Sequence, residues 1–161
     1  MLPLIRKKNK DGLFYYTTRK SVILKNLKNY TSFPVNDERE LLIKERFIEA
    51  ILMTSLRIEQ NLKEIYFRTY CKQVMGVYYE ILELSFNKIV NLCRASGIIT
   101  KEDFENIDLL RKARNEIAHN PHINNRTVDK EKCNLIINPC LNIIQKTHDE
   151  LVEISKKKIK K

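Results

Sequence analysis

Arg111-Lys-Ala-Arg-Asn-Glu-Ile-Ala-His-Asn-Pro121 is the stretch that decides how this chain is interpreted. Pro121 cannot continue a helix and disfavours helical geometry in the residue before it, so the stretch predicts a helix that stops near His119. Thr100 is the expected N-cap of that helix, and it is followed by two carboxylates in the first turn, where the helix dipole favours negative charge. A helix from Thr100 to His119 is therefore predicted.

An arginine falls on the apolar face of this predicted helix. At about 100° per residue, Arg114 lies near the middle of a stripe of apolar side chains: Phe104, Ile107, Leu110, Ile117 and Ala118. Arg111, Asn115 and His119 follow one another at four-residue spacing along the edge of the stripe. Because a guanidinium keeps its charge, burying it without a partner is costly. We therefore expect either an acidic partner for Arg114 or a ligand that needs its charge.

Length and composition indicate one helical domain. A chain of 161 residues can bury a substantial core, and it contains only three Gly and four Pro. No apolar run approaches the roughly 20 residues of a membrane span, and the first residues do not form a secretory signal, so a cytoplasmic protein without a membrane partner is predicted. The four cysteines lack CxxC spacing, which predicts reduced core residues and neither a metal site nor a cofactor.

The net charge of +10 is concentrated at the two ends of the chain. Residues 1–36 carry +7 and residues 156–161 carry +5, which leaves −2 for residues 37–155. The ends supply the candidate contacts to a nucleic-acid backbone: Lys7, Lys8, Lys157 and Lys158. Lysine-rich ends also promote solubility without binding anything, so both interpretations stay open.

The same three ranges give the predicted domain organisation. Residues 1–36 form a basic extension with a turn at Asp11-Gly12 and one possible helix over residues 13–30. Residues 156–161 form a lysine-rich tail. The body between them is predicted to contain four helices, over residues 37–70, 77–95, 100–119 and 127–155. Pro139 is expected to kink or split the last of these helices.

The first helix of the body carries a carboxylate on its apolar stripe. Ser55 and Glu59 both fall among the apolar residues of that stripe: Ile48, Ile51, Leu52, Leu62, Ile65 and Tyr66. A carboxylate on a core face is rare unless it is paired or functional, which makes Glu59 the candidate partner of Arg114. The alternative is a slightly rotated helix that leaves Glu59 in water at the edge of the stripe.

Arg114, Asn115 and His119 hold most of the chemistry that the sequence offers. Histidine is the side chain best suited to exchange a proton near neutral pH, and arginine can stabilise charge on a phosphate through paired donors. Such groups suffice to cleave RNA without a metal, because the ribose 2′-hydroxyl supplies the nucleophile. In the alternative interpretation Arg114 is bound to Glu59, Asn115 caps the helix end, and His119 is a surface residue.

Arg114-Asn115-Glu-Ile-Ala-His119 resembles the Arg-Asn-x-x-x-His motif of the HEPN superfamily (higher eukaryotes and prokaryotes nucleotide-binding). The similarity extends over residues 37–155 and includes the order of long helix, second helix, motif helix, loop and final helix. The resemblance implies an all-α, antiparallel bundle of four to five helices that forms a two-fold homodimer, with both Arg and both His in one cleft. Many members are metal-independent endoribonucleases in toxin–antitoxin and phage-defence systems.

By position, the resemblance implies that His119 transfers protons, Arg114 stabilises the phosphate and Asn115 orients them. Glu59 and Arg111 are assigned supporting places from the helical wheel alone. RNA, a second copy of the chain and a neutralising protein are the implied partners. Pro121 stands where members paired with nucleotidyltransferase antitoxins carry a tyrosine, which argues against that antitoxin.

Two other functions compete with the ribonuclease. HEPN modules also occur as non-catalytic units that bind a protein or nucleic-acid partner as a regulator or neutralising subunit. The third hypothesis is a purely structural helical dimer in which Arg114 and Glu59 form a buried pair.

Overall fold

The computed structural model describes residues 4–8, 14–18, 36–71, 75–120 and 122–159. The chain divides into two compact units, Met1–Phe33 and Pro34–Lys161, so the boundary lies three residues before the expected one.

The first unit contains a two-stranded antiparallel sheet. Strand β1 (Leu4–Lys8) pairs with β2 (Phe14–Thr18), with Leu4 opposite Thr18 and Lys8 opposite Phe14. The helix predicted over residues 13–30 is therefore wrong over the five residues of β2. Their sequence, Phe-Tyr-Tyr-Thr-Thr, consists of aromatic and β-branched residues, which favour strands. The rest of that predicted helix, and the Asp11-Gly12 turn, lie outside the described residues.

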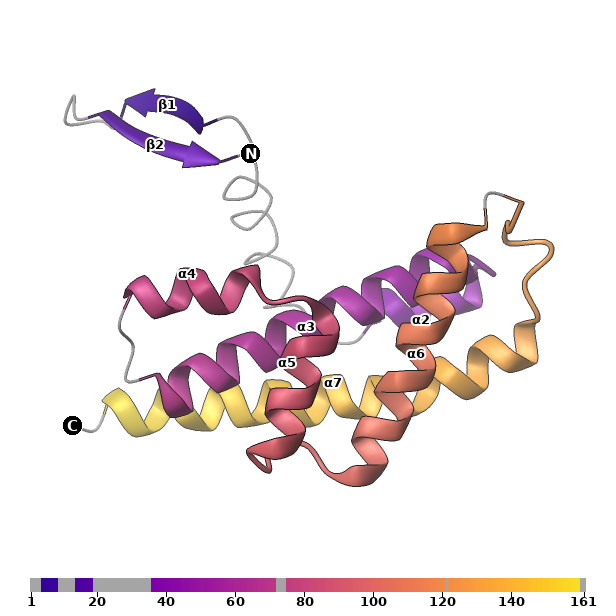
Figure 1. Cartoon of the computed structure of the whole chain (residues 1–161). Coiled ribbons are helices and arrows are strands. Elements are labelled where there is room, and N and C mark those ends of the chain that lie inside the picture. Colours follow the sequence, from indigo (N-terminus) through magenta and orange to yellow (C-terminus); the bar gives the residue numbers. More distant parts are fainter. Residues whose placement is uncertain (1–3, 9–13, 19–35, 72–74, 121, 160–161) are drawn as a thin grey trace. The chain divides into compact units, whose positions relative to one another are not determined.

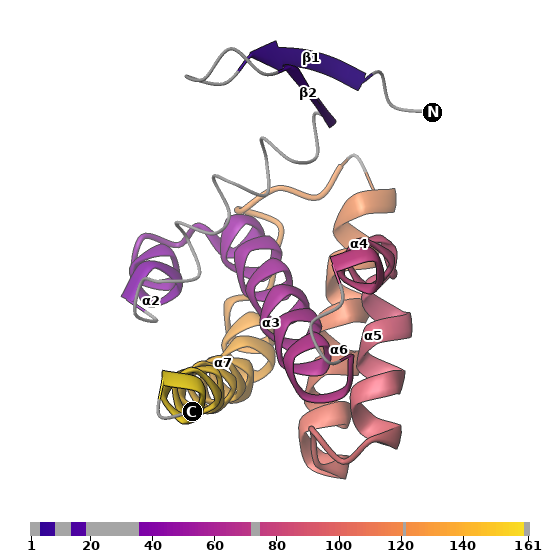
Figure 2. The ribbon, with the colours of Figure 1, turned by 90° about the vertical axis from the view of Figure 1, so that its left-hand side faces the viewer.

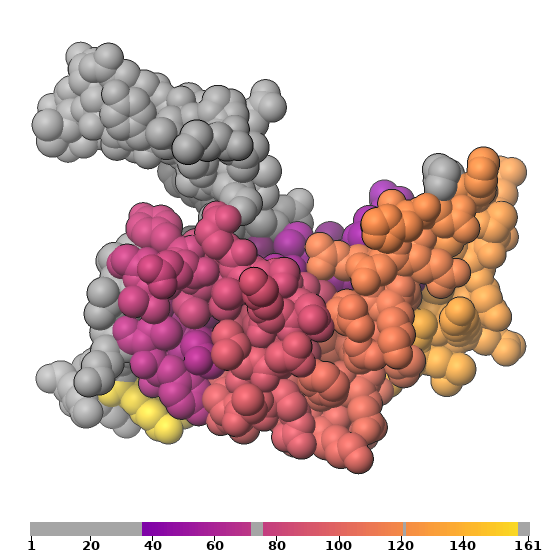
Figure 3. Space-filling model, viewed as in Figure 1, coloured from indigo at the N-terminus to yellow at the C-terminus, as the bar shows by residue number. Residues whose placement is uncertain are grey.

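The second unit is all-helical in its described part, as the composition predicts. Its six helices are α2 (Asn36–Ile43), α3 (Phe47–Tyr70), α4 (Met75–Glu83), α5 (Phe86–Ala95), α6 (Lys101–His119) and α7 (Lys130–Ile159). Helix α3 lies at the centre and packs against all five others (Figures 1 and 2). Helices α4, α5 and α6 cover one face of this unit (Figure 3). None of the described helices combines the length and the apolar composition that a membrane span requires.

Two predicted helices are each divided in the structure. Residues 44–46 separate α2 from α3, where Glu45 adopts a left-handed conformation with φ 56°. Ser85 separates α4 from α5 and caps α5 by accepting a hydrogen bond from the Lys88 N–H at 3.4 Å. Neither break contains Gly or Pro, and the only sequence indicator present is the N-cap residue Ser85.

The extra break at Ser85 also changes the direction of the last helix. Helices α6 and α7 are antiparallel, but α3 and α7 run in the same direction: Asn61 bonds Thr147, and Arg68 bonds Ser155 further along both helices. This parallel pair does not contradict a bundle of four to five antiparallel helices, because the first and fifth of five alternating helices run in the same direction. Four helices in alternation would make the first and last antiparallel, and the division into α4 and α5 adds one reversal.

The ends of α6 agree with the sequence prediction. Thr100 and Asp103 form a capping box, in which each side chain accepts a hydrogen bond from the other residue's backbone N–H. Asn120 is no longer helical: its backbone is extended, with φ −116° and ψ 97°, directly before Pro121.

Helix α7 differs from its prediction at its C-terminal end. It is not split at Pro139, so the kink stays the untested part of that prediction, and it ends at Ile159 instead of near Ser155. Lysine is a good helix former and its charge suits the C-terminal end of the dipole, which explains the additional turn. Part of the predicted lysine-rich tail is therefore helical.

The core lies between α3, α5, α6 and α7. Its fully buried side chains include Ile58, Leu62, Ile89, Ile107, Leu110, Ile137 and Ile144. All four cysteines are free, and Cys93, Cys133 and Cys140 are buried as predicted, while Cys71 is half-buried. Burial raises the pKa of Cys93 and of Cys140 to about 12, which keeps these thiols protonated and suits residues that pack in the core.

Candidate functional site

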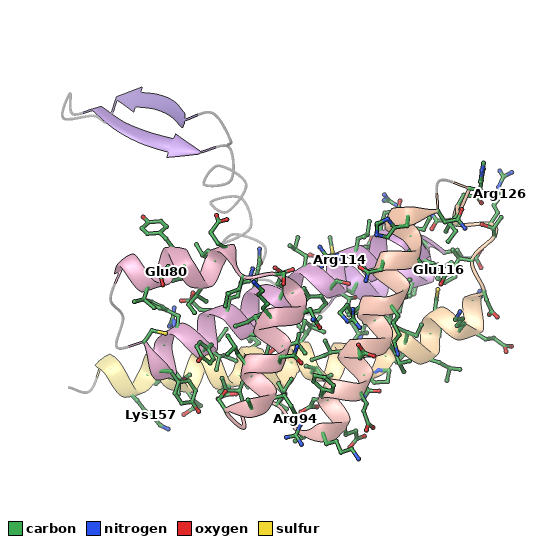
Figure 4. All side chains as sticks on the ribbon, in the orientation of Figure 1. Glu80, Arg94, Arg114, Glu116, Arg126 and Lys157 are labelled. Carbon is green, nitrogen blue, oxygen red and sulfur yellow. The ribbon has the colours of Figure 1, made fainter. Side chains whose placement is uncertain are left out.

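Arg114 and Glu59 form the ion pair that their positions on two helical stripes predict. The Arg114 Nη1 lies 3.4 Å from the Glu59 Oε2, and the pair joins α6 to α3. The guanidinium also lies over the ring of Phe86, the first residue of α5, at 5.6 Å from the ring centroid. Figure 4 shows Arg114 on the side of α6 that faces α3 and α5. The Arg114 side chain nevertheless keeps 36% of its surface exposed, so its charge stays accessible from solvent.

Lys63 completes this cluster and was not identified from the sequence. Its Nζ lies 2.6 Å from the Glu59 Oε1 and donates a second hydrogen bond to the Leu82 carbonyl oxygen at 3.1 Å. The Lys63 side chain is only 9% exposed. Glu59 therefore binds one buried cation closely and one exposed cation loosely, and the cluster keeps a net positive charge. The i, i+4 spacing of Glu59 and Lys63 could have revealed the pair.

Asn115 and His119 lie on the open side of α6. Both are exposed, and neither side chain forms a hydrogen bond or ion pair with another residue in the described part of the chain. They are four residues apart and therefore lie on one face of the helix. Their polar atoms are free to meet a ligand or a second copy of the protein.

One copy of the chain does not bring Arg114 and His119 together. Five residues along α6 separate them by about 140° around the helix and roughly 7.5 Å along its axis. Arg114 is directed toward α3 and α5, whereas His119 is exposed. The three motif residues thus share a helix but not a common point in space.

Arg111 has a local partner of its own. Its guanidinium donates two hydrogen bonds to the Asp108 Oδ1, at 2.6 and 3.0 Å, and the Lys112 Nζ lies 2.8 Å from the other carboxylate oxygen. The hydrogen bonds from Lys112 and Arg111 hold the pKa of Asp108 below its ordinary value. Arg111 is therefore bound to Asp108, about one helical turn before the motif, and its supporting role stays a prediction.

The lysines proposed for nucleic-acid contact lie in two elements, one in each unit. Lys7 and Lys8 belong to β1, in register with Tyr15 and Phe14. Lys157 is exposed in the last turns of α7, and Lys158 follows it in the same helix. Their contact with a nucleic acid remains a prediction.

A cavity of about 330 Å³ lies beside the motif and has no counterpart among the sequence predictions. It is bounded by α6, α7 and the loop that joins them, and Glu116 and Lys132 are among its lining residues. Sequence periodicity does not reveal it, because a cavity between helices depends on how the connecting loop folds.

Comparison with protein-family models, with curated proteins and with solved structures found no match. Among the described residues, no group of three or more His, Cys, Asp or Glu is placed to hold a metal ion. Any assignment of function therefore depends on the chemistry of the side chains themselves.

Proposed function

We propose that this protein is a metal-independent endoribonuclease of the HEPN type that acts as a homodimer, in a toxin or phage-defence system. The supporting observation is the state of three residues on α6. Arg114 is held in position by Glu59 and Phe86 but stays 36% exposed, and the exposed Asn115 and His119 have no partner among the described residues. A phosphate can replace the loose contact to Glu59 with paired, charge-assisted hydrogen bonds.

The separation of Arg114 from His119 is the reason for including a second copy. A two-fold axis that runs past the C-terminal half of α6 brings the same face of two chains together. His119 of one copy can then approach the Arg114 of the other, so the site is incomplete without the partner. The exposed Ala118, between Asn115 and His119 in the sequence, is small enough to let two helices approach closely.

The reaction follows from the chemistry of these groups. One His119 accepts the proton of a ribose 2′-hydroxyl, and the 2′-oxygen attacks the adjacent phosphorus. Arg114 stabilises the negative charge that develops on the phosphate oxygens, and Asn115 orients Arg114 and His119. The bond from phosphorus to the 5′-oxygen breaks, and a second His119 donates a proton to the leaving oxygen. The products are a 2′,3′-cyclic phosphate and a 5′-hydroxyl.

Cleavage of a mixed RNA pool in the presence of EDTA tests this proposal, with the product ends mapped. The wild type should cleave and leave 2′,3′-cyclic phosphates, whereas H119A and R114A should each lose at least a hundredfold in rate while remaining folded and dimeric. R94A and H148Q serve as matched controls, because both residues lie outside the motif helix. A folded R114A variant with undiminished activity would overturn the proposal.

A non-catalytic binding module is the second candidate. It is favoured by the Glu59 carboxylate, which already provides a counter-charge for Arg114. This candidate predicts no cleavage by the wild type, together with salt-dependent binding of RNA or binding of a partner protein. If removing the charges of Lys7, Lys8, Lys157 and Lys158 leaves RNA binding unchanged, the nucleic-acid form of this candidate fails.

A further inference from the structure

The cavity beside the motif helix has apolar walls and a small number of polar groups. Its volume of about 330 Å³ suits a small ligand. Ile117 on α6, together with Ile123 and Val128 from the connecting loop, supplies aliphatic surface. Glu116 lines the cavity from α6 and Lys132 lines it from α7. Figure 4 labels Glu116 on α6, near the loop that bounds the cavity.

The loop that bounds the cavity is held in place by hydrogen bonds within itself and to α3. Asn124 and Thr127 exchange hydrogen bonds within the loop, including Asn124 N–H to the Thr127 hydroxyl oxygen at 3.0 Å. Asn125 fastens the loop to α3: its Oδ1 accepts a hydrogen bond from the Ile48 N–H at 2.9 Å, and its Nδ2 donates to Glu49 at 3.0 Å. This last bond is the main reason why the pKa of Glu49 is lowered. The cavity is therefore preformed.

Two opposite charges in the cavity are left without partners. The side chains of Glu116 and Lys132 form no hydrogen bond or ion pair with each other or with any other described residue. Asp129 also lines the cavity, but its carboxylate already accepts the Lys132 N–H at the start of α7. The Asn120 Oδ1 accepts the His122 N–H at 3.1 Å, which leaves its amide NH₂ as a free donor. The cavity thus offers the Glu116 carboxylate, the second carboxylate oxygen of Asp129 and at least two free donors.

This pattern matches one nucleobase. A carboxylate accepts two parallel hydrogen bonds, and among the four RNA bases only guanine presents two adjacent donors, N1–H and the N2 amino group, on its Watson–Crick edge. Guanine also carries acceptors at O6 and N7, which an ammonium or amide donor can bind. Adenine, cytosine and uracil each place an acceptor beside their donor, and that acceptor would face a carboxylate oxygen without a hydrogen between them.

We propose that this cavity is a guanine-binding subsite, with Glu116 binding N1–H and N2–H₂ and with Lys132 and Asn120 donating to O6 or N7. The inference deepens the proposed function and rests on it for the identity of the ligand as an RNA base. Glu116 and His119 are separated by three residues on α6, so they are neighbours on the helix surface. A guanosine bound here places its 3′-phosphate beside His119, and cleavage occurs after guanine.

Binding of 3′-nucleotides tests the subsite without any need for catalysis. Titration of the full-length protein with 3′-GMP, 3′-AMP, 3′-CMP and 3′-UMP should show at least tenfold preference for 3′-GMP. E116Q replaces one acceptor with a donor and should abolish this preference, while E131Q, which changes an exposed glutamate of α7 outside the cavity, should retain it. Circular dichroism establishes that both variants are folded.

The outcomes separate the subsite from the nuclease. Equal binding of the four nucleotides, no binding of 3′-GMP at millimolar concentration, or an unchanged preference in E116Q each overturns the subsite. RNA cleavage without guanine preference overturns the subsite and leaves the nuclease standing. Selective 3′-GMP binding that depends on Glu116, in a protein that cleaves no RNA, supports the subsite and overturns the nuclease.

Discussion

Two arginine–glutamate pairs anchor neighbours to α3, and they differ in how far water reaches them. Arg57 joins Glu38 of α2 at 2.8 Å, with side chains that are 5% and 0% exposed. Arg114 of α6 joins Glu59 at 3.4 Å, with side chains that are 36% and 15% exposed. The first pair is enclosed in the unit, whereas the second opens to the surface next to the motif.

The difference indicates which pair can do chemistry. Breaking an enclosed pair leaves a charge without water or counter-charge, so Arg57 and Glu38 hold α2 in place. A half-exposed arginine with a long contact can change partners at small cost, particularly when a buried lysine already neutralises the shared carboxylate. The four predictions that follow test this contrast, ordered by their expected effect on the free energy of unfolding.

R57M should have the largest effect. The substitution leaves the Glu38 carboxylate fully buried without its main counter-charge, and it should lower the free energy of unfolding by about 3–5 kcal/mol. Urea unfolding followed by circular dichroism measures the change. R46M is the matched control, because Arg46 pairs with Glu49 at the surface, with 54% of its side chain exposed, and should lose about 1 kcal/mol or less.

K63M should have an intermediate effect. Lys63 makes charge-assisted hydrogen bonds to Glu59 and to the Leu82 carbonyl, and losing such bonds lowers the free energy of unfolding by about 1.5–3 kcal/mol. Glu59 is then left with Arg114 alone, which should tighten that pair and, in the proposed enzyme, slow RNA cleavage. K146M, which removes an exposed partner of Asp103, is the control and should affect neither quantity strongly. Faster cleavage by K63M would contradict the assigned role of Lys63.

Much of the fold was accessible from the sequence because its elements have local causes. The capping box at Thr100 and the stop before Pro121 fix α6, and the ion pair of Arg114 with Glu59 follows from two charges on apolar stripes. The two missed breaks have causes that one sequence does not show. Glu45 takes a positive φ without being Gly or Asn, and Ser85 caps α5 in the middle of an apolar run.

In the candidate site, too, some residues could be predicted from the sequence and others could not. Glu59 and Arg114 were found because each is a charge on an otherwise apolar stripe. Arg57 was missed because α3 is buried on several sides, so its polar residues facing α2 do not interrupt any single stripe. Glu116 and Lys132 were missed because they line one cavity only through the way in which the loop after α6 folds.

R114M should lower the free energy of unfolding by only about 1 kcal/mol, the sum expected from an exposed ion pair and an exposed cation–π contact. In the proposed enzyme it should nevertheless slow cleavage by about 10²–10³-fold, because the transition state loses a charged donor. Parallel unfolding and cleavage measurements separate the two effects. A stability loss as large as that of R57M would favour the structural dimer instead.

E38Q tests the smallest effect, which is a change in how the free energy of unfolding depends on pH. Burial is the main reason why the pKa of Glu38 is raised above 4.5, although Arg57 opposes it. Between 4.5 and the raised pKa, the folded state binds more protons than the unfolded state, so the Glu38 contribution to stability falls as pH rises through that interval. The free energy of unfolding of the wild type should therefore decline relative to that of E38Q over this interval, in urea titrations from pH 4 upward. The carboxylates with lowered pKa, such as Asp108 and Glu49, are common to both proteins and cancel in the comparison. Parallel pH profiles for the two proteins would show that water reaches Glu38, and the contrast between the two arginine–glutamate pairs would then be lost.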